Sequence, residues 1–179
     1  MASFWFVTAP LPGHLDWGGM LKTAKLLRAG GHEVLWVSQP PIAPMVEAAG
    51  IEFAPIAETG WLWPPPPMPD PRTLKPAEGI FLRYRRALDT WLSEALIPPA
   101  VQAIVALANE RGKPSTIVAD PFLTAAAFAA EALDVPLIVS SGTGSIFPSA
   151  TRTINSAALI GPPNCAKSAA HFRALSITF

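Results

Sequence analysis

An alternation of short apolar runs with helical patterns constrains the fold of this sequence more than any other feature. Residues 3–8 (SFWFVT) and 33–38 (EVLWVS) are apolar runs bounded by turn residues, which is typical of strands covered on both faces. Between them, residues 20–28 place apolar side chains at helical spacing, and a glycine pair follows. This strand, helix and strand predict a βαβ unit with a right-handed crossover.

The same alternation continues along the chain. Further helices and strands are expected in turn at residues 42–49, 51–55, 115–119, 122–133 and 135–140. A long amphipathic helix is expected over residues 78–111, bent or restarted at Pro98-Pro99. The pattern predicts an α/β fold, a doubly wound Rossmann-like domain with a mostly parallel sheet.

We expect the 179 residues to form a single domain, because the chain is long enough for one domain of ordinary size and too short for two. Residues 58–76 interrupt the alternation and are expected to form an inserted loop rich in proline and tryptophan. Residues 142–179 form a poorly defined tail in which no sixth strand is evident.

The composition argues against several classes of protein. The 13 basic residues balance the 13 acidic ones, so nucleic acid is not expected as a partner. The single cysteine excludes an internal disulfide framework and any site with several cysteine ligands, in keeping with a cytoplasmic location. No transmembrane segment is expected, because the N-terminal apolar run stops at Pro10 and residues 123–139 are interrupted by charges and a proline.

Two polar residues follow predicted strands at the edge where parallel sheets bind ligands. His14 lies in a turn that two prolines and Gly13 make rigid, and Asp120 directly follows the strand expected at residues 115–119. A carboxylate beside an imidazole fixes its tautomer and stabilises the imidazolium, so this pair can act as a general base on a hydroxyl. Alternatively, His14 only caps the next helix or packs under a loop. We expect His32, at a helix-to-strand turn, to be structural.

Two stretches carry a resemblance to a known family. "FVTAPLPGHLDWGGMLKTAKLLRAGGHEVLWVS" resembles the N-terminus of inverting nucleotide-sugar glycosyltransferases of the GT-B fold, which include UDP-glycosyltransferases and bacterial macrolide and antibiotic glycosyltransferases. "IVADPFLTAAAFAAEALDVPLIVSSGT" looks like the Asp-bearing strand, Ala-rich helix and next strand of that family. The resemblance covers residues 1–145 and implies the N-terminal, acceptor-binding domain, with the donor-binding domain absent.

The resemblance implies a reaction. His14 would deprotonate a hydroxyl of an apolar small-molecule acceptor, and Asp120 would orient and balance it. A sugar would pass with inversion from a UDP- or dTDP-sugar, a co-substrate, without a metal or other cofactor. Gly13 is expected beside the substrate. Asp16 and Trp17 are expected beside the substrate as well. They stand where the family often has Asn-Pro, so they either alter the donor-side contacts or add a second carboxylate near His14.

Further residues are candidates for substrate binding. Trp61, Trp63 and Met68 lie on the stiff proline-rich segment, where inserts of the family line the acceptor pocket. Alternatively, this loop folds back and covers the core. Gly142 and Thr143 follow the last predicted strand and offer backbone N–H groups to a phosphate or the acceptor, unless they form a simple turn.

The resemblance also implies partners. Alone, the chain is expected to lack transferase activity and to need the missing C-terminal domain or a separate chain that supplies it. Half of the residues are hydrophobic and 15% are charged, which is typical of a domain with an apolar face that another domain covers or that mediates self-association. The alternative is a non-catalytic α/β module that binds a small molecule or a partner; a generic nucleotide-binding domain is a third reading.

Overall fold

The computed structural model describes residues 1–15, 19–64, 67, 70, 73, 75–91 and 93–140. Several of the predicted features lie outside the described residues, namely Asp16, Trp17, Met68, Gly142, Thr143 and the tail at 142–179.

The described residues form one sheet in which all strands are parallel. Its strand order is β3-β2-β1-β4-β5, so the chain moves outward from β1 to β3, crosses back over β1 and continues outward through β4 to β5. This topology confirms the predicted doubly wound, Rossmann-like α/β fold. The strands are β1 (Ser3–Val7), β2 (Glu33–Ser38), β3 (Glu52–Pro55), β4 (Thr116–Ala119) and β5 (Leu137–Val139).

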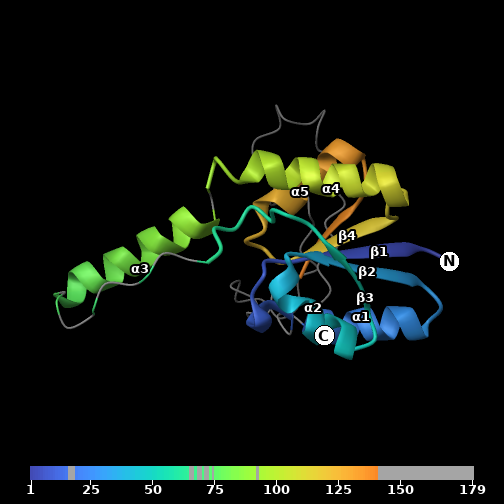
Figure 1. Ribbon diagram of the computed structural model, residues 1–179, viewed down its shortest axis with the longest axis horizontal. Coiled ribbons are helices and arrows are strands. Elements are labelled where there is room, and N and C mark those ends of the chain that lie inside the picture. Colours follow the sequence, from blue (N-terminus) through green and yellow to red (C-terminus); the bar gives the residue numbers. More distant parts are fainter. Residues whose placement is uncertain are drawn as a thin grey trace, which may run out of the picture.

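Helices cover both faces of the sheet (Figure 1). On one face lie α1 (Met20–Ala29) and α2 (Ala43–Ala48), and on the other lie α4 (Ile97–Arg111) and α5 (Thr124–Leu133). The remaining helix, α3 (Pro76–Trp91), projects from the side of the molecule opposite the N-terminus. Among the described residues, no helix has both the length and the apolar character that a membrane span requires.

The two cores explain why the strands read as continuous apolar runs. Along β1, Trp5 and Val7 belong to the core beneath α4 and α5, whereas Phe6 belongs to the core beneath α1 and α2. The rings of Phe6 and Trp36, from neighbouring strands, stack with their centroids 5.3 Å apart. Both faces of each strand therefore need apolar side chains, as in other sheets buried between helices.

The helical stretch predicted over residues 78–111 is two helices. α3 ends at Trp91 and α4 begins at Ile97, so a restart of the helix is confirmed near the proline pair. Pro98 and Pro99 lie in the first turn of α4, where a backbone N–H has no partner within the helix and its loss costs little. The chain therefore breaks before the prolines rather than at them.

Candidate functional site

The topology brings the segments that carry His14 and Asp120 to one edge of the sheet. β1 and β4 are neighbours, and their last residues, Val7 and Ala119, are paired in register. Asp120 directly follows β4, and His14 lies after β1 in a short 3-10 helix, η1 (Pro12–Leu15). Parallel sheets bind ligands at this carboxyl edge. The side chain of His14 is not among those described, so its contact with Asp120 stays a prediction.

The carboxylate of Asp120 is buried and held by the turn that it begins. Its side chain is 2% exposed, and Oδ1 accepts a hydrogen bond of 2.9 Å from the backbone N–H of Phe122. The backbone carbonyl of Asp120 also accepts a hydrogen bond from the N–H of Leu123, just before α5 begins. A short acidic side chain that bonds the backbone two residues on is typical of such a turn. The hydrogen bond from Phe122 thus orients the carboxylate within its own turn.

A buried polar network at the ends of β1 and β2 was not predicted as part of the site. Trp36 Nε1 donates a hydrogen bond of 2.9 Å to Thr8 Oγ1, and Ser38 Oγ donates one of 2.7 Å to the backbone carbonyl of Thr8. Thr8 and Ser38 are fully buried. This network fixes the base of the turn that carries His14. A sequence signal existed, because Thr8 and Ser38 are the polar residues that end the two predicted strands.

The segment after β3 is tied to the same edge. Ile56 donates its N–H to the carbonyl of Ser38 at 2.9 Å, and Gln39 Nε2 donates to the carbonyl of Ala57 at 2.8 Å. Thr59 is fully buried, and no hydrogen-bond partner of its Oγ1 is found in the structure as far as it is described. These contacts hold the start of the predicted 58–76 loop against the body of the domain.

The two described tryptophans of this loop differ in exposure. Trp61 is 4% exposed and belongs to the core beneath α4 and α5, together with Ile104 and Leu123. Trp63 is 37% exposed. At Trp61 the loop therefore packs onto the core, which was one of the two alternatives for this segment. A role of either tryptophan in acceptor binding stays a prediction.

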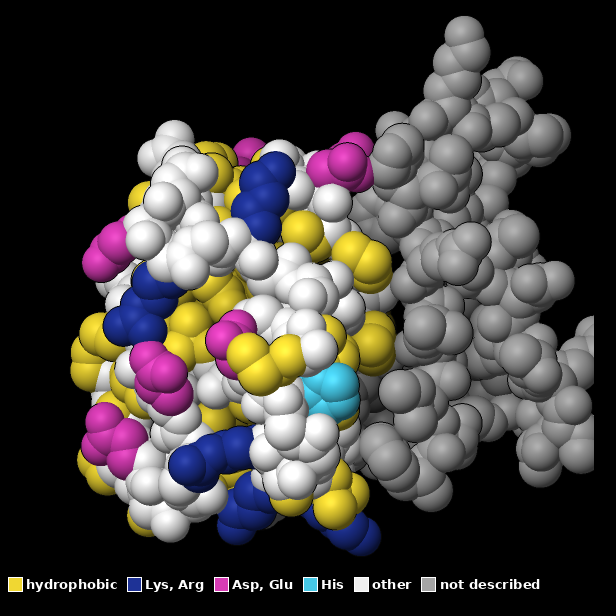
Figure 2. Space-filling model, turned by 90° about the vertical axis from the view of Figure 1, so that its right-hand side faces the viewer, with side chains coloured by type: hydrophobic (Ala, Val, Ile, Leu, Met, Phe, Trp, Pro, Cys, Tyr) yellow, Lys and Arg dark blue, Asp and Glu magenta, His cyan; other side chains and the backbone are white. Residues whose placement is uncertain are grey.

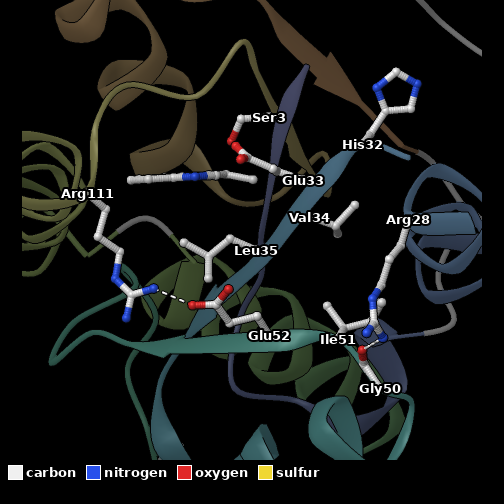
Figure 3. Close-up of a pocket in the computed structure, with 11 residues that line it drawn as sticks. Ser3, Arg28, His32, Glu33, Val34, Leu35, Gly50, Ile51, Glu52 and Arg111 are labelled. Carbon is white, nitrogen blue, oxygen red and sulfur yellow. Dashed lines mark hydrogen bonds and ion pairs between the residues drawn. The ribbon is translucent and has the colours of Figure 1, made fainter. Parts of the chain in front are cut away.

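A cavity of about 560 Å³ lies at the opposite, amino edge of the sheet. Figure 2 shows this face, where hydrophobic side chains form the floor of a hollow and charged ones stand around it. Arg111 Nη1 contacts Glu52 Oε1 at 2.5 Å on one side, and Arg28 donates to the carbonyl of Gly50 on the other (Figure 3). Because the cavity surrounds the starts of β1 to β3, it is separate from the edge at which β4 ends and Asp120 follows.

His32 lines this amino-edge cavity and makes structural contacts, as predicted. Its Nδ1 accepts a hydrogen bond of 3.3 Å from the N–H of Ala2, and its ring meets that of Phe4 edge to face at 5.4 Å. These contacts fasten the start of β1 to the start of β2. His32 therefore serves as a comparison for His14, which follows the other end of β1.

The carboxyl edge offers acid–base chemistry. Among residues 1–15, 19–64, 75–91, 93–140 and the three single positions described, no group of three or more His, Cys, Asp or Glu side chains could hold a metal ion. The groups that the topology brings to the edge are one imidazole-bearing residue and one buried carboxylate. Such a pair is suited to removing a proton from a hydroxyl.

Curated sequences show no match to this chain, whereas solved structures do. No protein-family model matches the chain, and no curated protein sequence matches it. Solved glycosyltransferases do match its structure. SpnG, a spinosyn rhamnosyltransferase, is 24% identical with a TM-score of 0.55, and SsfS6 from Streptomyces sp. SF2575 is 25% identical with a TM-score of 0.52. CalG4, the calicheamicin glycosyltransferase, is 18% identical with a TM-score of 0.54.

Each match covers 78% of this chain but only 34% of SpnG, 39% of SsfS6 and 32% of CalG4. The chain thus spans about a third of the length of these proteins. SpnG has been solved with thymidine diphosphate and with spinosyn aglycone. The structural neighbours are glycosyltransferases, as the resemblance in the sequence predicted, and the described residues share the fold of part of a GT-B glycosyltransferase.

Proposed function

We propose that this chain is the acceptor-binding half of an inverting glycosyltransferase, with His14 as general base and Asp120 as the carboxylate that orients it. The observation that carries the proposal is the pairing of β1 with β4, which brings the segments after both strands to one edge. The glycosyltransferase fold of the neighbours supports the reaction class.

The proposed step is a direct displacement. The acceptor hydroxyl gives its proton to the imidazole of His14 while its oxygen forms a bond to the anomeric carbon of the donor sugar. The bond from that carbon to the nucleotide diphosphate breaks, and the diphosphate leaves with the electron pair, so the configuration inverts. Asp120, which is almost fully buried, would stabilise the imidazolium more strongly than a solvated carboxylate does.

We propose a dTDP- or UDP-sugar as the donor. SpnG and VinC have been solved with thymidine diphosphate, which supports a nucleotide-sugar donor for a chain of this fold. Since the chain spans about a third of such proteins, we infer that most donor contacts come from residues outside these 179, on the same or a separate chain. The 179 residues alone are then inactive as a transferase.

We propose an apolar molecule with a free hydroxyl as the acceptor. Trp63, half-exposed beside the buried Trp61, offers an aromatic surface near the carboxyl edge, and Met68 belongs to the same segment. Gly13, Asp16 and Trp17 would meet the substrate from the turn after β1, as would Gly142 and Thr143 from the segment after β5. SpnG with spinosyn aglycone is an example of a neighbour that takes such an acceptor.

The proposal is tested by supplying a donor-binding part to this chain. The chain is fused to, or mixed with, the donor-binding part of SpnG, and transfer from a dTDP-sugar to a panel of hydroxylated apolar acceptors is followed by mass spectrometry. Transfer should require both parts, and His14→Ala should lower it by at least about a hundredfold, the contribution of a general base. The matched control is His32→Ala, at the other end of the sheet, which should keep transfer.

Three outcomes would contradict the proposal. Acceptor binding that occurs without transfer and is unaffected by His14→Ala would identify a non-catalytic binding module. Equal transfer by the His14→Ala variant and the original chain would remove His14 from the mechanism. Tight nucleotide binding by the 179 residues alone would favour a nucleotide-binding domain instead.

A further inference from the structure

Helix α3 carries an apolar stripe that faces away from the rest of the protein. Ile80, Phe81, Tyr84 and Leu88 are 59%, 79%, 71% and 52% exposed, although they lie along one side of the helix. The side chains that are partly buried, such as Leu82, lie on another side. Figure 1 shows that α3 projects from the body, so the stripe has no covering element among the described residues.

The spacing of the stripe indicates what would cover it. Phe81, Tyr84 and Leu88 follow one another at intervals of three and four residues along the helix. Apolar residues at alternating intervals of three and four form the seam of a helix that packs along another helix. The occupant that this spacing fits is therefore an α-helix lying lengthwise on α3.

We propose that this occupant is α3 of a second copy of the chain, paired antiparallel about a two-fold axis that passes between Phe81 and Tyr84. In such a pair, residues that face each other have numbers with a constant sum. Phe81 then faces Tyr84 of the second copy, and Tyr84 faces Phe81 of the second copy. The two aromatic side chains beside the axis thus meet the same two side chains of the partner, which is what a self-complementary two-fold interface requires.

The charges beside the seam favour this partner and this direction. Glu78 and Arg85 lie on the same flank of the stripe, two helical turns apart. Antiparallel pairing about the proposed axis brings Glu78 of each copy alongside Arg85 of the other, so two ion pairs form. The opposite flank carries Ile80, which has no charge to leave unpaired. Parallel pairing would instead place the charged flank against the apolar flank.

The contacts that Glu78 and Arg85 make within one copy leave both side chains able to pair with a second copy. Glu78 Oε2 accepts a hydrogen bond of 3.1 Å from the N–H of Lys75, and Arg85 Nε lies 3.6 Å from Asp89 Oδ2. The side chains of Arg85 and Asp89 are 78% and 64% exposed, so their ion pair is solvated and weak. Arg85 can therefore share or exchange this partner at little cost.

The area of the stripe sets the strength of the dimer. Aromatic side chains present about 150–250 Å² each, so Phe81 and Tyr84 with their two aliphatic neighbours offer roughly 500 Å² per copy. Two copies bury roughly 1,000 Å², near the lower limit of specific interfaces. We therefore expect a dissociation constant on the order of micromolar. The inference does not depend on the proposed enzymatic function.

Sedimentation equilibrium of the 179-residue chain from about 1 to 300 μM tests the proposal, over a range that spans the expected constant. The chain should be in monomer–dimer equilibrium, and Leu88→Asp should abolish the dimer because it places charges in the seam. The control is Phe128→Asp, at a side chain on α5 that is also exposed, at 51%, and should leave the equilibrium unchanged. A monomer at every concentration, or a dimer that survives Leu88→Asp, would overturn the proposal.

A charge reversal tests the direction of pairing. Glu78→Arg and Arg85→Glu should each raise the dissociation constant by about tenfold, because two attractive pairs become repulsive. The double variant should return to within about threefold of the original value. Residues 78 and 85 are about 10 Å apart on one helix, so this rescue cannot arise within a single copy. A double variant that binds no more tightly than the single variants would rule out the antiparallel register.

Discussion

Gly60 offers a test of how the loop after β3 is seated at the proposed acceptor edge. Its φ of +84° lies in the region that residues with a side chain rarely adopt. A Cβ built on Gly60 would lie 3.1 Å from Cβ of Ala125 on α5 and 3.7 Å from Cβ of Ala100 on α4. The loop thus approaches two helices closely just before Trp61 enters the core. We expect Gly60→Ala to destabilise the protein through both backbone strain and crowding.

The two contributions can be separated with glycines of the same chain. Gly31 has a nearly identical φ of +83°, but a Cβ there would meet no atom within 4 Å, so Gly31→Ala should cost only the backbone strain, about 1–2 kcal/mol. Gly60→Ala should cost about 1 kcal/mol more, at the low end for overpacking, since the backbone must shift by tenths of an ångström. Gly79 lies within α3 with open space around it, and Gly79→Ala should stabilise by about 0.5–1 kcal/mol.

Urea denaturation followed by circular dichroism and tryptophan fluorescence would measure these differences. The expected order of the free energy of unfolding is Gly79→Ala above the original chain, then Gly31→Ala, then Gly60→Ala. For a protein of this size, each kcal/mol corresponds to about 2–4 °C in melting temperature. If Gly60→Ala were no less stable than Gly31→Ala, the close packing of the loop against α5 would be refuted.

The polar groups at the carboxyl edge give further predictions. Thr8→Val should destabilise the protein by about 1–3 kcal/mol, because it leaves the buried Trp36 Nε1 without its acceptor. Thr59→Val should be neutral or stabilising, because the Thr59 hydroxyl is equally buried and no partner for it is found in the described structure. Thermal unfolding of both variants compares them, and a loss at Thr59 as large as that at Thr8 would contradict this account. Asp120→Asn should keep an acceptor for the Phe122 N–H and therefore most of the stability. In the reconstituted transferase it should still lower transfer by about a hundredfold or more, because the charge that stabilises the imidazolium is gone. Asp120→Ala should lose both transfer and about 1–2 kcal/mol of stability; unchanged transfer in either variant would exclude the proposed role.

The order and type of the elements were predictable from the sequence because burial on both faces leaves a simple pattern. Short apolar runs such as residues 3–8 and 33–38 are typical of strands in the middle of a sheet that helices cover on both faces. Predicted and observed strand bounds differ by at most two residues at either end. The rule that parallel strands end at a common edge then predicts that the segments with His14 and Asp120 lie at that edge.

The tertiary contacts of the loop and of α3 were not predictable in the same way. Nothing local distinguishes Trp61, which enters the core, from Trp63, which stays half-exposed, since both stand in the same proline-rich segment. For α3 the periodicity correctly predicted a helix with an apolar side. A periodic pattern shows that a face needs a covering partner and does not specify which element supplies it. In this chain the described residues leave that face open.

The contacts of α3 connect this open face to the candidate site. The carbonyl of Thr90, near the end of α3, accepts a hydrogen bond of 3.1 Å from the N–H of Leu62, which lies between Trp61 and Trp63. Thr90 is buried, and its Oγ1 donates to the carbonyl of Arg86 one turn earlier. A partner that holds α3 would therefore also restrain the segment that presents the two tryptophans. If α3 pairs with a second copy, the loop would be fixed at two points, at Gly60 by α5 and at Leu62 by the paired α3. Acceptor binding should then depend on protein concentration over the same range as dimerisation. Acceptor affinity that is identical in the original chain and in Leu88→Asp would show that the two features are independent.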